Sequence, residues 1–110
     1  MATTYKRSGV QGTNSVSTYA TLYTVPASTS SVISTIAICN TASAAATYRI
    51  GFDDTAGTPT ASEWLVYDAT VDGNDTVFLS VGAALAAEKY VRVSSDADTV
   101  TFQAFVSEIS

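Results

Sequence analysis

Residues 46–52, Ala-Thr-Tyr-Arg-Ile-Gly-Phe, carry the clearest structural signal in the sequence. Large apolar side chains at Tyr48, Ile50 and Phe52 alternate with smaller or polar residues at positions 47, 49 and 51. Successive side chains of a β-strand point to opposite faces, so this period of two predicts a strand with one buried face. The stretch therefore indicates a fold built from strands.

The segment before it, Ser31–Asn40, is apolar on both faces that a strand would present. With strict alternation, one face holds Val32, Ile36 and Ile38. The opposite face holds Ile33, Ala37 and Cys39. This pattern is typical of a strand that is covered on both sides, or of one whose outer face meets a partner.

Turn-forming residues divide the rest of the chain into further short segments of the same kind. They predict five more strands, at Tyr19–Val25, Glu63–Ala69, Asp75–Val81, Glu88–Ser94 and Thr99–Ser107. Asp72–Asp75 is predicted to be a tight turn, Asp53–Ser62 the longest internal loop, and Gly82–Ala87 a single helical turn or loop. Short strands with regular turns predict an all-β fold: a single antiparallel β-sandwich or jelly roll of about seven to eight strands.

Residues 1–17 are polar and lack a repeating apolar face, so we expect them to form an extended N-terminal arm before a β-sandwich domain at 18–110. Tyr5, Lys6 and Arg7 give this arm an aromatic side chain and two positive charges. They are the candidate interface residues, because a basic arm can lie across an acidic neighbour. Removal of residues 1–17 is expected to weaken binding and to leave the fold intact.

The charge balance argues against two classes of partner. The chain of 110 residues has a net charge of −5, and two of its five basic residues are Lys6 and Arg7. An acidic body repels phosphate, so neither nucleic acid nor an anionic membrane is expected as a partner. No apolar run is long enough for a membrane-spanning helix, and the N-terminus lacks the apolar core of a secretory signal.

The residue inventory also argues against catalysis, so we expect no enzyme activity. The sequence contains no histidine, the commonest general base, and Cys39 is its single cysteine. Cys39 is therefore interpreted as a structural residue at the end of an apolar strand. Glu63 beside Trp64 is the best candidate for glycosidase chemistry, but a core tryptophan after a solvated glutamate is the favoured interpretation.

Calcium is the one metal that the sequence brings into consideration. Its hard oxygen ligands would come from two predicted loops, at Asp53, Asp54, Asp72, Asn74 and Asp75. Aspartate and asparagine also favour turns through hydrogen bonds to their own backbone, which explains both clusters without an ion. No metal site, cofactor or catalytic residue is predicted, and the glycosylation sequon at Asn74 is interpreted as a chance match in a turn.

Several of these segments together resemble small virion structural proteins of tailed bacteriophages, notably phages of marine bacteria and cyanobacteria. The resemblance rests on residues 22–27 (LYTVPA), 32–40 (VISTIAICN), 46–50 (ATYRI), 85–87 (LAA), 90–93 (YVRV) and 102–109 (FQAFVSEI). It extends from about residue 19 to the C-terminus. Glu88 departs from the pattern, which has glycine before the strand that follows.

The resemblance implies a non-enzymatic part of a virus particle that is assembled in the host cytoplasm. One role that it implies is a head decoration (cement) protein, a trimer on the outer capsid surface, with the major capsid protein as partner. The alternative role is a tail, baseplate or fibre-associated structural or adhesin module. A different class also stays open beside the resemblance: a carbohydrate-binding module or adhesin that recognises a host surface. In that case we expect Trp64, Tyr67 and Tyr90 on an exposed face.

Overall fold

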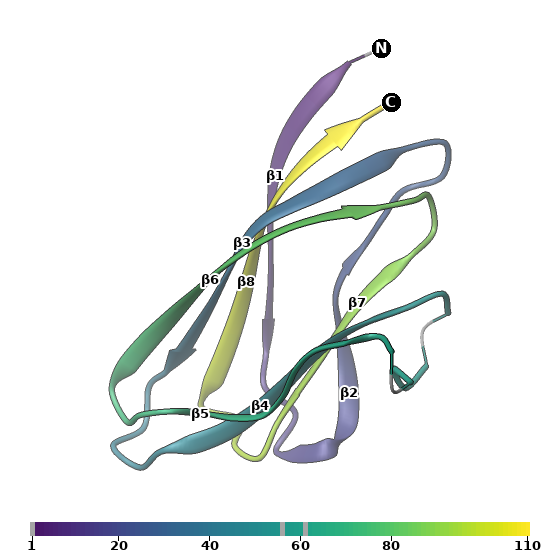
Figure 1. The fold of residues 1–110 in the computed structure, drawn as a ribbon. Coiled ribbons are helices and arrows are strands. Elements are labelled where there is room, and N and C mark those ends of the chain that lie inside the picture. The colour runs from purple at the N-terminus through teal and green to yellow at the C-terminus, as the bar shows by residue number, and fades with distance from the viewer. Residues whose placement is uncertain (1, 56, 61) are drawn as a thin grey trace.

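The computed structural model of the chain describes residues 2–55, 57–60 and 62–110. Within these ranges it contains eight β-strands and no helix (Figure 1). The strands are β1 (Thr3–Gln11), β2 (Ser15–Thr24), β3 (Ser30–Asn40), β4 (Ala46–Asp53), β5 (Trp64–Val71), β6 (Asp75–Leu85), β7 (Tyr90–Ser95) and β8 (Val100–Ile109). The predicted all-β class is confirmed. No helix in the described ranges has the length and hydropathy to cross a membrane.

The strands form two four-stranded antiparallel sheets, sheet 1 in the order β1-β8-β3-β6 and sheet 2 in the order β2-β7-β4-β5. β1 pairs with β8, β2 with β7, β3 with β6 and β4 with β5. The first half of the chain is thus rolled up antiparallel against the second half. Of the two predicted alternatives, this strand order is that of an eight-stranded jelly roll.

The core lies between the two sheets and is mostly aliphatic. Each strand contributes alternate residues, as the period of two requires. The largest fully buried side chains include Phe102, Leu22, Ile33, Ile36, Ile38, Ile50, Val91 and Val93. Tyr48 packs its ring edge-on against Phe102 at 6.2 Å between centroids. The alternation at Ala46–Phe52 therefore predicted the inward side of β4 correctly.

A β-bulge corrects the predicted faces of β3. The register of β3 shifts between Ile33 and Thr35 against both of its neighbours, and Ser34 is an extra residue relative to β8. The shift turns Ile33 to the same side as Ile36 and Ile38, where all three are fully buried. Val32 is turned outward instead. One inserted residue moves the side chains that follow it to the other face, which strict alternation cannot anticipate.

The prediction that residues 1–17 precede the sandwich as an arm is also corrected. Thr3–Gln11 forms β1, an edge strand that pairs with β8 along its whole length. Its pairing needs backbone hydrogen bonds rather than apolar side chains, and Val10 alone in β1 packs against the core. Deletion of residues 1–17 would remove this strand and the start of β2, so it cannot separate binding from folding.

β6 extends beyond the strand predicted at Asp75–Val81. It continues through Gly82, which has a φ of 63°, to Leu85, so the predicted helical turn or loop at Gly82–Ala87 is wrong up to Leu85. Pairing with β3 overrides the helix propensity of the alanines, since Ala83 and Ala84 lie opposite Ile33 and Val32. Glu88, in the turn that follows, has a φ of 66°, a conformation that favours glycine.

The Asp72–Asp75 turn exists as predicted, but it leads from sheet 2 into sheet 1 instead of closing a hairpin within one sheet. It packs against the β3–β4 connection, where the Asn74 amide donates to the Ala42 carbonyl oxygen at 2.8 Å. A Cβ on Gly73 would lie 2.0 Å from the Ser43 carbonyl oxygen. These two crossing connections thus fix one end of the sandwich.

Candidate functional site

The structure separates the three predicted interface residues. Tyr5 and Arg7 point to the solvent side of sheet 1, while Lys6, between them in sequence, points to the other side. Tyr5 is 80% exposed, and Arg7 lies close enough to donate a 3.4 Å hydrogen bond to the side-chain oxygen of Gln103. The Lys6 ammonium is 3.1 Å from Glu108 of the same chain. Lys6 therefore forms an ion pair within the chain, whereas Tyr5 and Arg7 remain available to a partner.

Glu108 is a buried carboxylate where β1, β2, β3 and β8 meet. Tyr23 donates its hydroxyl hydrogen bond to Glu108, and the same hydroxyl is 2.8 Å from the Ser31 hydroxyl. The hydrogen bond from Tyr23 and the Lys6 ammonium hold the pKa of Glu108 below its usual range. Burial, with the adjacent carboxylate, raises the pKa of Tyr23 to about 12. This network of hydrogen bonds and an ion pair links the end of sheet 1 to β2 of sheet 2.

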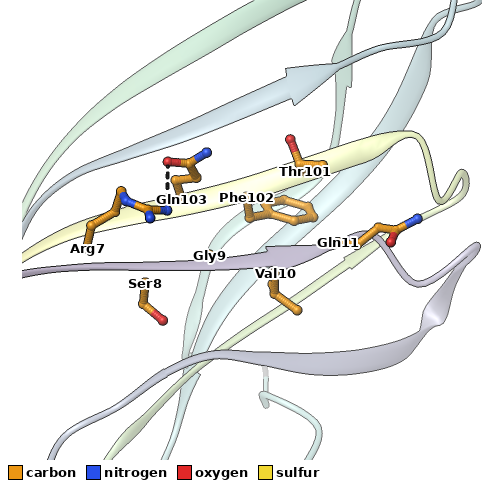
Figure 2. Close-up of a pocket in the computed structure, with 8 residues that line it drawn as sticks. All are labelled: Arg7, Ser8, Gly9, Val10, Gln11, Thr101, Phe102 and Gln103. Atoms are coloured by element: carbon orange, nitrogen blue, oxygen red, sulfur yellow. Dashed lines mark hydrogen bonds between the residues drawn. The ribbon is translucent and has the colours of Figure 1, made fainter.

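An open pocket of about 510 Å³ follows β1 and β8 (Figure 2). Figure 2 shows Arg7 joined to Gln103 on one side of β1, with Ser8 and Val10 directed to the other side. Gly9 leaves a gap between its neighbours because it has no side chain. The lining supplies hydrogen-bonding amides and hydroxyls and one permanent positive charge. These groups can bind a polar surface.

The solvent side of sheet 1 is a broad surface, which we call face 1. It comprises the outward residues of four strands: Tyr5, Arg7, Gly9 and Gln11 of β1; Thr101, Gln103, Phe105 and Ser107 of β8; Val32, Thr35, Ala37 and Cys39 of β3; and Thr76, Phe78 and Ser80 of β6. Phe78 is 69% exposed and Phe105 is 37% exposed. Exposed aromatics among short uncharged side chains are typical of a surface that meets another protein.

Face 1 has a single charged residue, Arg7. All ten acidic residues of the chain lie in the described ranges, and none of them is on this face. Glu108 and Asp75 lie on the inward side of sheet 1. The others lie in sheet 2 or in the connections, at Asp53, Asp54, Glu63, Asp68, Asp72, Glu88, Asp96 and Asp98. The negative charge of the molecule is therefore distributed away from face 1.

The solvent side of sheet 2, which we call face 2, is occupied by its own side chains. It is formed around Tyr19, Thr21, Arg49, Gly51, Trp64, Tyr67 and Arg92. The Arg49 guanidinium lies 4.0 Å from the centre of the Tyr67 ring and 2.6 Å from a carboxylate oxygen of Asp68. The Trp64 ring lies between those of Tyr19 and Tyr67, at centroid distances of 5.7 and 5.0 Å. Cation–π contacts and an ion pair thus order this face.

Arg49 and Asp68 shift each other's proton affinity on face 2. Hydrogen bonding to Asp68 is the main reason why the pKa of Arg49 is raised, and the guanidinium lowers the pKa of Asp68. Asp68 reaches this position because the register of β5 shifts there and its φ is 55°. The bulge thus places the carboxylate beside the guanidinium.

The connection between β4 and β5 covers part of face 2. Asp53 accepts hydrogen bonds from Gly57 and Thr55 of this connection, and the Arg92 guanidinium donates to the Gly57 carbonyl oxygen at 3.0 Å. Pro59 is buried over Gly51, where a Cβ would lie 2.7 Å from the proline ring. The Asp53 carboxylate is therefore used within its own loop, the role that the turn interpretation predicted.

The structure also places three other candidates from the sequence, Trp64, Glu63 and Cys39. Trp64 is half-buried on face 2 and does not belong to the core between the sheets, so its interpretation as a core residue is wrong. Glu63 accepts hydrogen bonds from the backbone and hydroxyl of Thr60 in the connection before β5. Cys39 is a half-buried free thiol on face 1.

Of the three aromatics expected on one exposed face, the structure brings Trp64 and Tyr67 together. Tyr67 is 56% exposed. Tyr90 begins β7 on the same side of sheet 2 but is half-buried, and no ring contact joins it to the other two in the described residues. Those residues also hold no group of three or more acidic, histidine or cysteine side chains placed to share a metal ion.

Sequence reasoning missed the importance of Phe78 and Phe105. In both strands the neighbouring residues 77, 79, 104 and 106 are inward-facing and apolar. A large aromatic residue at the alternate position was the available signal, because it breaks the apolar-in, polar-out pattern. The exposed aromatics come together only when β3, β6 and β8 are placed side by side.

No protein-family model and no curated protein matches this sequence. A solved structure does match: the chain is similar to one in the acidic stable capsid structure of Helicobacter pylori bacteriophage KHP30. The similarity covers 100% of this chain and 94% of that chain, with a TM-score of 0.56 and 14% sequence identity. At this identity the comparison establishes that the two chains share a fold.

Proposed function

We propose that the chain is a non-enzymatic structural protein of a bacteriophage virion, specifically a head decoration (cement) protein. The observation that carries the proposal is the fold similarity, over the whole chain, to a chain in a phage capsid structure. Jelly rolls also occur in lectins and enzymes, so the fold alone does not decide the role. The residue inventory, which lacks histidine, adds support from the chemistry.

The surface of the molecule fits such a role. A decoration protein binds the assembled shell, here the major capsid protein across capsomer joints, and stabilises it by binding the intact state alone. Each copy contributes a modest interface, and many copies together resist the pressure of packaged DNA. A broad uncharged face on a small acidic molecule suits this type of contact, and a homotrimer is the assembly proposed here.

The copy number and location of the chain test this proposal. Heads and tails of the particle are separated, and the chain is quantified in each fraction against the major capsid protein. Hundreds of copies in the head fraction are expected for a decoration protein. On the order of a dozen copies in the tail fraction, as expected for a symmetric tail ring, would overturn the decoration role in favour of a tail or baseplate component.

One observation favours a second candidate, a tail or fibre-associated adhesin that binds carbohydrate. Tyr67 is exposed beside Trp64, and aromatic rings present flat apolar surfaces to sugar rings. The Arg49 guanidinium already lies over the Tyr67 ring, so part of this surface is occupied. Quenching or a shift of Trp64 fluorescence by host surface glycans would support this role, and an unchanged spectrum with all of them would contradict it.

A further inference from the structure

We infer that the chain docks on the head shell through face 1, with face 2 and the acidic connections turned to solvent. The inference rests on the proposed function and adds to it the surface that makes the contact and the chemistry of its partner. The partner surface is a flat, largely uncharged area of the shell.

The first argument is the distribution of charge. Arg7 is the single charged residue of face 1, whereas face 2 and the connections after β4, β5, β6 and β7 have acidic side chains. Burying an unpaired carboxylate in an interface costs several kcal/mol, so a docking surface is expected where such groups are absent. Of the two broad sheet faces, face 1 satisfies this condition, while face 2 has Asp68.

The second argument is the exposure of aromatic side chains. Tyr5, Phe78 and Phe105 come from β1, β6 and β8, so they are distributed across the width of sheet 1. They are among the five large hydrophobic residues that are exposed in the described chain. In the part of the chain that the structure describes, no cation lies over Phe78 as Arg49 lies over Tyr67 on face 2. Aromatic side chains of this kind act as anchors in interfaces.

The third argument concerns the free edge of β6. This strand pairs with β3 alone, and it contains no charged residue from Thr76 to Leu85. The other edge strands have features that discourage pairing: β1 contains Lys6 and Arg7, while β2 and β5 have register shifts. β6 has one bulge, after Ser80, and its residues 75–80 are regular. Such an edge is expected to be covered in the assembly.

The shell is a better occupant for face 1 than a second copy of the chain. Two copies packed face to face would bury the acid-free surface of both. The resulting dimer would present two copies of face 2 and the acidic connections, and it would have no sheet face without carboxylates for the shell. Because the proposed function requires one face to contact the shell, face 1 is assigned to that contact.

A pair of matched substitutions tests the inference. Phe78→Glu places a carboxylate on face 1, and Tyr67→Glu places one on face 2; both positions are exposed aromatics, at 69% and 56%. Each variant and the wild type are titrated onto purified heads from which the chain has been removed. Phe78→Glu should lower the affinity at least tenfold, roughly the effect of losing an interface anchor, and Tyr67→Glu should change it less than about threefold.

Each outcome has a distinct meaning. If the wild type binds and Phe78→Glu binds equally well, or if Tyr67→Glu has the larger effect, face 1 is the wrong surface while the decoration role stands. If the wild type does not bind heads at all, the proposed function and the inference both fail. If Phe78→Glu instead converts a wild-type oligomer to monomers in sedimentation, a second copy covers face 1 and the inference is overturned.

A folding control and a second variant on face 1 keep the test valid if a substitution unfolds the protein. Trp64 is the single tryptophan, so its fluorescence reports on the folded state of the face 1 variants, and circular dichroism does so for Tyr67→Glu, whose side chain contacts the Trp64 ring. Ser80→Glu supplies a second exposed position on β6 should Phe78→Glu unfold. It is expected to lower the affinity in the same direction, and unchanged binding of a folded Ser80→Glu would contradict the inference.

Discussion

The two solvent faces of the sandwich differ in how many of their charged and aromatic side chains have partners within the molecule. On face 2, Arg49 pairs with Asp68 and stacks on Tyr67, and a loop packs Pro59 over Gly51. On face 1, Phe78 is 69% exposed and the side chains around it are short and uncharged. The side chains of face 2 thus already have partners within the chain, whereas the exposed aromatics of face 1 are typical of one half of an interface.

The difference shows that aromatic residues on a surface do not by themselves identify a binding site. Trp64 and Tyr67 are the residues that the sequence singled out, yet they are mainly engaged with each other and with Arg49. Neither Phe78 nor Phe105 was a candidate binding residue in the sequence, and neither has an aromatic or cation–π contact within the described residues. What distinguishes the two faces is whether the charges and rings have partners inside the fold.

The largest expected effect on stability is found when one glycine on each face is replaced by alanine, because only the substitution on face 2 should destabilise the fold. A Cβ at Gly51 would lie 2.7 Å from Pro59 and 3.1 Å from Trp64, so Gly51→Ala should destabilise the fold by about 1–3 kcal/mol. A Cβ at Gly9 on face 1 would meet its nearest atoms at ordinary contact distances of 3.5 Å. Gly9→Ala should therefore be neutral or stabilising, by up to about 1 kcal/mol. Urea unfolding measures both, and equal destabilisation by the two substitutions would contradict the difference between the faces.

The next largest effect is expected for Glu108, whose substitution should lower the stability of the fold and leave binding through face 1 unchanged. Glu108→Gln removes the charge that pairs with Lys6 and accepts from Tyr23, so it should destabilise the fold by about 1 kcal/mol at neutral pH without altering face 1. Because the pKa of Glu108 is lowered in the fold, its stabilisation is present above the ordinary glutamate pKa and is lost as the pH falls through the lowered one.

The free energy of unfolding, measured from neutral to acidic pH, should therefore decrease less steeply for Glu108→Gln than for the wild type. Asp68→Asn is the matched control, since the pKa of Asp68 is also lowered but its side chain is exposed on face 2. Its effect on the pH profile should be the smaller of the two. A larger effect from Asp68 would mean that the surface pair stabilises the fold more than the buried network.

Glu88 lies in the connection from sheet 1 to sheet 2 and belongs to neither face. Its φ of 66° is unfavourable for a side chain with a Cβ, so Glu88→Gly should raise the free energy of unfolding by about 0.5–1 kcal/mol. Binding to heads should not change. Destabilisation in urea unfolding would show that the Glu88 side chain contributes more than its backbone strain costs.

The smallest effect concerns the charge on face 1. Since Arg7 is the single charge there, binding to heads should depend weakly on ionic strength, and Arg7→Gln should lower the affinity by less than about threefold. Titrations at low and high salt check this expectation. A loss of more than tenfold between them would indicate that charges, rather than uncharged surface, dominate the interface.

The parts of the fold that the sequence predicted are those with one apolar side. The strand predicted at Ala46–Phe52 is found at Ala46–Asp53, because its inward side is apolar at every second residue. β1 could not be predicted in this way, since its inward positions include Thr4, Lys6 and Ser8. An edge strand is held largely by backbone hydrogen bonds to its neighbour, which leave no pattern in its side chains.

The faces were harder to predict than the strands. Ser34 and Asp68 each lie where the register shifts, and each shift changes which residues point outward. No residue type marks such an insertion reliably, so neither the outward position of Val32 nor the Arg49–Asp68 pair could be derived from alternation. Tyr5 and Arg7, two of the three candidate interface residues, lie on the solvent side of β1, whereas the pairing of Lys6 with Glu108 depends on the β1–β8 register.

The decisive measurement is a three-dimensional reconstruction of the intact particle, because it shows where the jelly roll lies and which of its sheets meets the neighbouring protein. We expect many copies on the outside of the head, each with Phe78 and Phe105 against the shell and Trp64 toward solvent. A jelly roll in the tail, or one on the head with sheet 2 against the shell, would contradict it.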